Sequence, residues 1–230
     1  MYKRQVYTVD LLGCGRSDKS SITYTNFVYV QMISDFIKKI IGQKTDVIAS
    51  GFSGSFVTMA CHNEKELFNK IMLVNPPSLT QLKQMPNRKD RLLKAALEIP
   101  IFGTLVYHMI VSRDNINNLF IEKMYYNPFH VDNQMADAYY EAAHKGGYYT
   151  RFLYSSLAAK YININICHAL KALDNSIYIV EGETEPNGKA VTDDYCASNP
   201  AIEVSVLKET KHLPHVEAPE AFLEQVKIFF

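Results

Sequence analysis

The chain has 230 residues, of which 47% are hydrophobic, and its 24 lysine and arginine side chains are balanced by 24 aspartate and glutamate side chains. This length supports one domain with a sizeable core. A net charge of zero leaves no field that would attract nucleic acid or an anionic membrane surface. We therefore expect a single domain over residues 1–230 whose partner is a small molecule.

The spacing of the cysteines and the length of the apolar segments indicate the cellular compartment of the protein. The four cysteines are scattered without Cys-x-x-Cys spacing, which argues against a zinc site and gives no disulfide framework. They are Cys14, Cys61, Cys167 and Cys196. No signal-peptide pattern and no run of about 18 apolar residues occurs. The sequence thus predicts a cytoplasmic protein with no metal and no membrane span.

The first part of the chain reads as strands that alternate with helices. Gln5–Asp10 is expected to be a short strand, and the apolar spacing over Asn26–Ile41 predicts an amphipathic helix. Apolar runs at 47–50 and 70–75 predict buried strands, and 55–62 between them predicts a helix. This alternation is typical of a sheet whose strands are joined by helices.

Residues 79–161 have helical periodicity without strand signals, which predicts a helical insertion. Strands are expected again at 176–181 and 202–207, before a closing helix at 219–230. Strands separated by helices predict an α/β fold with a mostly parallel sheet covered by helices on both faces. The core of the domain would comprise residues 1–78 and 162–230.

A tight turn at residues 50–55 joins a predicted strand to a predicted helix. Three serines compete for its apex, Ser50, Ser53 and Ser55. Only small residues fit two positions before and two positions after such an apex, and Ser53 alone has them, in Gly51 and Ser55. We therefore expect Ser53 to be a nucleophile in a variant of the Gly-x-Ser-x-Gly turn, which lifts a hydroxyl above the sheet.

A serine nucleophile needs a histidine to take its proton and a carboxylate to fix the tautomer of that histidine. His212 lies just after the last predicted strand, where a loop can bring its ring over the sheet, and His215 is the nearby alternative. On the acidic loop after the preceding strand, Glu185 comes before a proline that favours a fixed extended backbone. Three further carboxylates remain as lesser candidates: Glu183, Asp193 and Asp194.

These motifs, in the chain order serine, acid and histidine, resemble the α/β-hydrolase superfamily. The resemblance covers the whole chain and rests on Asp10–Asp18, Gly51–Ser55, Val74–Pro76 and His212–Pro219. It implies an α/β-hydrolase fold that needs no cofactor. It also implies a lid over residues 79–161 that shapes the substrate pocket, and the backbone amide of Gly54 as one oxyanion donor.

The start of the chain departs from the superfamily. Its members usually carry further strands and a His-Gly loop before the strand equivalent to residues 5–10, and that loop supplies the second oxyanion donor. We therefore expect an N-terminally incomplete member whose strand at 5–10 is exposed along one edge. Since one oxyanion donor is worth roughly a hundredfold or more in turnover, the chain is expected to be a poor esterase.

The leading hypothesis is a serine hydrolase that cleaves a carboxylic ester, or a related acyl bond, through an acyl-Ser53 intermediate. His212 would be the general base, and Glu185 would orient it. A lid rich in Tyr, Phe, Met and Leu favours an apolar acyl or aromatic ester as substrate. The alternative is a non-catalytic, hydrolase-like ligand-binding protein or pseudoenzyme, which a fluorophosphonate probe would leave unlabelled.

Overall fold

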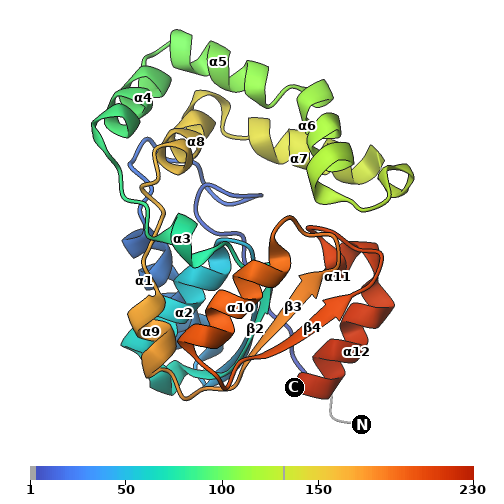
Figure 1. Cartoon of the computed structure of the whole chain (residues 1–230). Helices are drawn as coiled ribbons and strands as arrows, with labels where there is room; N and C mark the ends of the chain where they lie inside the picture. The colour runs from blue at the N-terminus through green and yellow to red at the C-terminus, as the bar shows by residue number, and fades with distance from the viewer. Residues whose placement is uncertain (1–3, 132) are drawn as a thin grey trace.

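A computed structural model of the chain describes residues 4–131 and 133–230. Within these residues the centre of the molecule is a four-stranded parallel sheet in the order β1-β2-β3-β4 (Figure 1). The strands are β1 (Thr45–Ser50), β2 (Phe68–Val74), β3 (Ile177–Gly182) and β4 (Glu203–Leu207). Parallel neighbours require long crossover connections, and helices supply them here. The α/β fold with a parallel sheet is as predicted.

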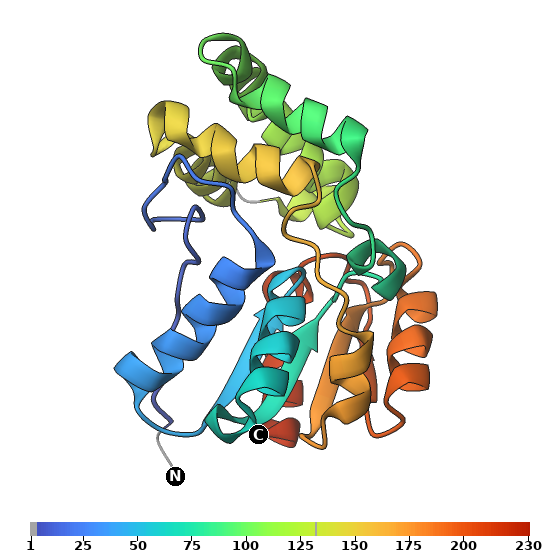
Figure 2. The same cartoon turned by 90° about the vertical axis from the view of Figure 1, so that its left-hand side faces the viewer.

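Helices cover both faces of the sheet (Figure 2). Strand residues alternate between the faces, so Ile71 and Ile179 join one cluster of buried side chains while Met72 and Val180 join another. The first cluster includes side chains from α1 (Asn26–Phe36), α2 (Ser53–Asn63), α9 (Cys167–Ala172) and α10 (Gly188–Ser198). The second cluster is packed against α12 (Pro219–Phe229), which follows the short α11 (Pro214–Glu217).

The helix predicted at 26–41 changes character along its length. It is α-helical as α1 and continues as a π-helical turn, η1 (Ile37–Ile41). Gly42 then adopts a φ of 72°, and its amide donates to the carbonyl oxygen of Ile37. This left-handed cap suits glycine because it carries no Cβ. A shorter 3-10 turn, η2 (Lys65–Leu67), leads from α2 into β2.

A group of helices between β2 and α9 forms a second layer over the end of the sheet at which the strands finish (Figures 1 and 2). We call residues 88–158 the helical layer. It contains α4 (Arg88–Glu98), α5 (Phe102–Ile110), α6 (Arg113–Leu119), η3 (Phe120–Met124), η4 (Pro128–His130), α7 (Asn133–His144), η5 (Gly147–Tyr149) and α8 (Thr150–Ala158). The preceding α3 (Leu79–Leu82) instead packs into the core cluster of the sheet through Leu79 and Leu82.

The predicted strand at Gln5–Asp10 is wrong. Residues 4–10 form no strand, and Val6 is 80% exposed. A strand is stabilised by backbone hydrogen bonds to a neighbouring strand, whereas this segment is held by contacts between side chains. The Tyr7 ring meets that of Phe36 at 6.3 Å, and Arg4 pairs with Asp46 at 3.2 Å. The sheet edge on this side of the described structure therefore belongs to β1 rather than to residues 5–10.

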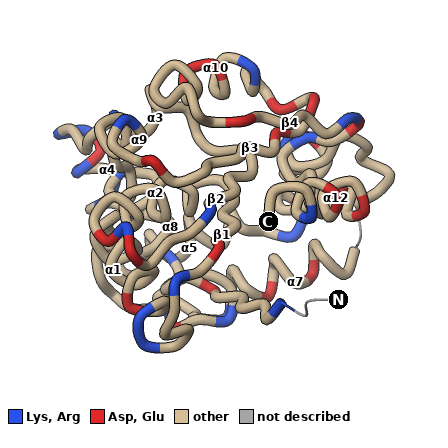
Figure 3. The backbone as a smooth tube through the Cα atoms, turned by 90° about the horizontal axis from the view of Figure 1, so that it is seen from below, with Lys and Arg blue, Asp and Glu red and all other residues tan. Residues whose placement is uncertain are grey.

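Charges of both signs are mixed along the chain (Figure 3). In the part of the chain that the structure describes, no single helix has both the length and the apolar character needed to cross a membrane. Helices α4 and α5 meet these criteria only as a pair, and the chain bends by 98° between them.

Candidate active site

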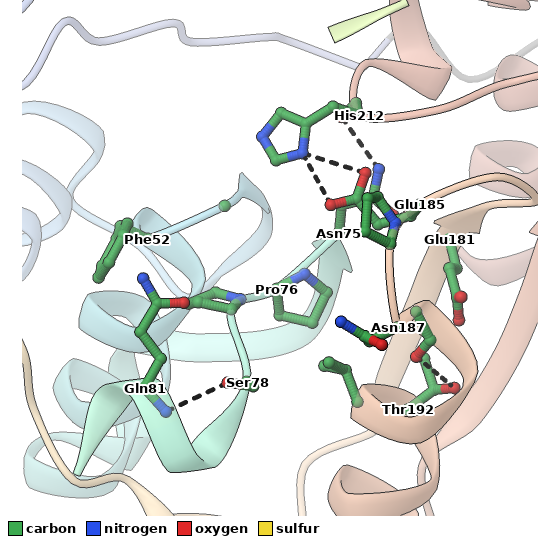
Figure 4. A pocket seen from close by; sticks show the side chains of 15 residues that line it. Phe52, Asn75, Pro76, Ser78, Gln81, Glu181, Glu185, Asn187, Thr192 and His212 are labelled. Carbon is green, nitrogen blue, oxygen red and sulfur yellow. Dashed lines mark hydrogen bonds and ion pairs between the residues drawn. The ribbon is translucent and has the colours of Figure 1, made fainter. Parts of the chain in front are cut away.

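A cavity of about 380 Å³ opens where the strands of the sheet end. Loops after β1, β2, β3 and β4 contribute to its wall, which is the usual place for a ligand in an open parallel sheet. Its lining is part polar and part apolar (Figure 4). Its lining residues include Gly51, Phe52, Asn75, Glu181, Glu185 and His212.

The structure brings His212 and Glu185 together at this cavity. The Nδ1 atom of His212 lies 3.1 Å from Oε1 and 3.2 Å from Oε2 of Glu185 (Figure 4). The histidine side chain is 33% exposed and the glutamate side chain 21%. A carboxylate facing Nδ1 favours the tautomer that carries its proton there, which leaves Nε2 able to accept a proton.

Backbone hydrogen bonds fix the loop that carries Glu185. The Glu185 amide donates to the Gly182 carbonyl oxygen at 3.0 Å, and the Gly188 amide donates to the Glu185 carbonyl oxygen at 3.0 Å. The Thr184 amide, in the loop after β3, donates to the carbonyl oxygen of Thr210, in the loop after β4, also at 3.0 Å. The loops after β3 and β4 are therefore held together next to the histidine.

Asn75 holds the loop that carries His212. It adopts a left-handed φ of 43° directly after β2. Its side-chain amide donates to the carbonyl oxygens of Lys211 and His212 at 2.8 and 2.9 Å, and its Oδ1 accepts from the Gly182 amide at 3.0 Å. Sequence reasoning included Asn75 in the motif at Val74–Pro76 but gave it no role in the site. The available signal was an asparagine at the end of a buried strand, since asparagine tolerates the left-handed region.

The His212 loop also contacts the helical layer. The amide of His212 donates to the carbonyl oxygen of Met124 at 3.1 Å, and Nζ of Lys211 donates to that of Glu122 at 2.5 Å. Glu217 accepts from the amides of Lys211 at 2.7 Å and Tyr126 at 2.6 Å. The segment around Tyr126 is thus bonded to the same loop that positions the histidine.

The turn between β1 and α2 places Ser53 differently from the sequence-based expectation. Ser53 is the first residue of α2, and its Oγ donates to the carbonyl oxygen of Ser50 at 2.6 Å. Among the described residues no hydrogen bond joins Ser53 to His212. The positive φ of this turn, 56°, belongs to Gly51. The amide of Gly54, expected to be an oxyanion donor, donates to the carbonyl oxygen of Gly51 at 3.1 Å.

His215, the alternative histidine, lies away from the cavity lining. Its ring packs against the ring of Phe222 on α12 at 5.8 Å, and its Nδ1 is buried without a partner. Burial is the main cause that lowers the pKa of His215, and the nearby His212 lowers it further. In the described structure the His212 ring therefore meets a carboxylate, whereas the His215 ring packs against Phe222.

The lesser acid candidates do not compete with Glu185. A carboxylate oxygen of Glu183 accepts from the Glu209 amide at 2.9 Å, while Asp193 and Asp194 are exposed on α10. Glu181, expected only to end a strand, instead lines the cavity and is 6% exposed. Burial is the main cause that raises the pKa of its carboxyl group. The cavity therefore holds two carboxyl groups in different surroundings.

Within residues 4–131 and 133–230, no group of three or more His, Cys, Asp or Glu side chains is placed to hold a metal ion.

A sequence model of the α/β-hydrolase family matches residues 2–225, and the chain belongs to this family. A comparison with curated proteins found no match. The parallel sheet, the covering helices and a histidine beside a carboxylate where the strands end agree with this membership.

Solved structures share the fold at low sequence identity. A bromoperoxidase from Bacillus anthracis is similar at 12% identity and a TM-score of 0.73, over 96% of this chain and 79% of that one. A carboxylesterase from the thaumarchaeon Nitrososphaera gargenis is similar at 16% identity and a TM-score of 0.68, over 96% of this chain and 77% of that one. The 2-hydroxy-6-oxo-6-phenylhexa-2,4-dienoate hydrolase from Rhodococcus sp. strain RHA1 is similar at 16% identity and a TM-score of 0.72. The match covers 96% of this chain and 78% of that one.

Proposed function

We propose that this chain hydrolyses an ester or a related acyl bond of a small molecule at the cavity where its strands end. The observation that carries the proposal is the hydrogen bond between Nδ1 of His212 and the carboxylate of Glu185. This pairing leaves Nε2 of His212 as a base, and Glu185 stabilises the imidazolium that forms when Nε2 takes a proton.

The reaction requires a nucleophile whose proton passes to His212. The expected acyl-serine route would use Ser53, but its hydroxyl must first break its hydrogen bond to the carbonyl oxygen of Ser50. The geometry gives better support to a water molecule as the nucleophile. Water would add to the carbonyl carbon while its proton passes to Nε2 of His212. That proton then goes to the leaving alcohol oxygen, so that an acid and an alcohol are released.

The cavity wall supports a small acyl or aryl group as the apolar part of the substrate. Phe52, Pro76, Pro77 and Val191 contribute apolar surface. A volume of about 380 Å³ lies within the range of small-molecule sites. We further propose that the segment at 79–161 acts as a lid, in keeping with the helical layer that lies over this end of the sheet (Figure 1). The carboxylesterase among the structural neighbours makes simple esters the first compounds to test.

The test is turnover of p-nitrophenyl acetate and p-nitrophenyl butyrate by the whole chain. A positioned general base contributes roughly 100-fold to 10,000-fold. We therefore expect His212→Ala to lose about 100-fold or more, and Glu185→Gln to lose activity through the same proton transfer. His130→Ala is the matched control, because His130 is exposed on η4 in the helical layer. Equal turnover by wild type, His212→Ala and His130→Ala would overturn the proposal.

A ligand-binding protein without turnover is the second candidate. The observation that favours it is the turn after β1, where Gly51 lines the cavity and the Ser53 hydroxyl is bonded to Ser50. In that case esters and their acid products should raise the melting temperature of the wild type, with no release of p-nitrophenol above the buffer rate. Turnover that depends on His212 excludes this second candidate.

A further inference from the structure

We infer that Gly51 occupies the nucleophile position of the turn between β1 and α2, and that this chain therefore presents no side chain there. The inference deepens the proposed function, because it concerns the same cavity and the atom that attacks the substrate. Three separate features of the turn support it: the backbone conformation, the free space beside Gly51 and the hydrogen bonding of the neighbouring amides.

The backbone conformation singles out Gly51. In a strand–turn–helix nucleophile motif, the nucleophile sits at the sharp apex of the turn in a strained conformation. Strand β1 ends at Ser50, Gly51 has a φ of 56°, and Phe52 is already helical with a φ of −58° and a ψ of −30°. The apex is therefore Gly51. Ser53 lies two residues later, inside the first turn of α2.

The space beside Gly51 is open. A Cβ atom added to Gly51 would meet no heavy atom within 4 Å, whereas a Cβ added to Gly54 would lie 3.1 Å from Cδ2 of Leu73. Gly51 and His212 line the same cavity. A side chain at position 51 would therefore extend into free volume that it shares with the histidine, where a nucleophile is required.

The backbone amides give a third, independent indication. The oxyanion donor of this motif is the amide of the residue that follows the nucleophile. If Ser53 were the nucleophile, the donor would be Gly54, but that amide already donates to the Gly51 carbonyl oxygen. With Gly51 as the apex the donor becomes Phe52. The amide of Phe52 has no hydrogen-bond partner in the described part of the chain, and Phe52 lines the cavity.

These features assign Ser53 a structural role. Its hydroxyl satisfies the carbonyl oxygen of Ser50 at the point where β1 ends. Since glycine carries no hydroxyl or thiol, the apex cannot form an acyl-enzyme. Hydrolysis in the wild type then depends on water activated by His212, and the space beside Gly51 can hold that water.

The test is to place a hydroxyl at the apex. The variants Gly51→Ser, Gly51→Ala and Ser53→Ala are treated with a fluorophosphonate probe alongside the wild type, and the labelled peptide is identified by mass spectrometry. We expect label at position 51 in Gly51→Ser and none in the other three proteins. Gly51→Ala is the matched control, because it adds the same Cβ at the same φ without a hydroxyl. With p-nitrophenyl acetate, only Gly51→Ser should release a burst of p-nitrophenol, the kinetic sign of an acyl-enzyme.

The outcomes separate this inference from the proposed function. Label on Ser53 of the wild type, lost in Ser53→Ala, would overturn the inference even if Gly51→Ser does not fold. A folded but unlabelled Gly51→Ser, with its fold verified by circular dichroism, would also overturn it. A wild type without turnover, combined with label at position 51 in Gly51→Ser, would refute the proposed hydrolysis and support the inference about Gly51.

Discussion

Asn75 holds His212 through the backbone rather than through the imidazole ring. Its side-chain amide donates to the His212 carbonyl oxygen at 2.9 Å, while its Oδ1 accepts from the Gly182 amide at 3.0 Å. One buried side chain thus joins the ends of β2 and β3 to the loop that carries the proposed base. The pairing of His212 with Glu185 depends on this arrangement, because Glu185 is itself anchored on Gly182.

The first prediction concerns the Asn75 amide. Asn75→Gly keeps the left-handed backbone accessible and removes all three hydrogen bonds, so the free energy of unfolding should fall by about 1 to 3 kcal/mol. In Asn75→Asp the Gly182 contact is kept, but a carboxylate oxygen is placed against two carbonyl oxygens, so an equal or greater loss is expected. Urea unfolding measures both effects. An Asn75→Gly variant as stable as the wild type would contradict the bridging role.

The second prediction concerns Glu217, whose carboxylate accepts from the amides of Lys211 and Tyr126. Hydrogen bonds to a charged group are worth about 1.5 to 3 kcal/mol. We expect Glu217→Ala to lower the free energy of unfolding by about that amount, and to increase protease cleavage near Tyr126. The matched control is Glu224→Ala, since Glu224 is exposed on α12. Equal protease sensitivity of the two variants would show that Glu217 does not anchor this segment.

The third prediction is a pH dependence that comes from Glu181. Burial raises the pKa of this carboxyl group from its usual 4.5. Because the folded state then binds the proton more tightly than the unfolded state, this contribution to stability is present below about pH 4.5 and is lost as the pH rises through the raised pKa. Glutamine resembles the neutral acid and cannot ionise.

Glu181→Gln should therefore match the melting temperature of the wild type near pH 4 and exceed it near pH 8. Differential scanning fluorimetry across this range measures the difference. Glu203→Gln, at an exposed position on β4, controls for the general effect of exchanging glutamate for glutamine. A constant difference between Glu181→Gln and wild type at all pH values would show that the ionisation of Glu181 is not coupled to folding.

Most of the fold could be predicted from the sequence because hydrophobic periodicity reports burial. The strand predicted at 47–50, for example, is part of β1, and the strand predicted at 70–75 overlaps β2 as far as Val74. Gln5–Asp10 shows the limit of this reasoning. A short run with strand-like composition becomes a strand only where another strand offers hydrogen bonds, and the sequence does not report that neighbour.

The site was harder to predict than the fold. His212 and Glu185 could be chosen because each follows a strand, and parallel strands bring the loops that follow them to one edge. The turn at 50–55 was harder, because a Gly-Ser-rich segment offers several positions for its apex. The steric argument favoured Ser53, whereas the dihedral angle places the apex at Gly51, directly after the last residue of β1. The sequence does not report the exact end of the strand, and that end is needed to choose between the two positions.

The hydrogen bond from the His212 amide to the Met124 carbonyl oxygen has a consequence for how this protein can be re-engineered. Exchanging the helices above the sheet would be one way to change which compounds reach the cavity. Here those helices also supply an acceptor to the backbone of the proposed base. A transplanted helical layer must therefore bring a carbonyl oxygen to the same place, or the imidazole loses one of its backbone restraints.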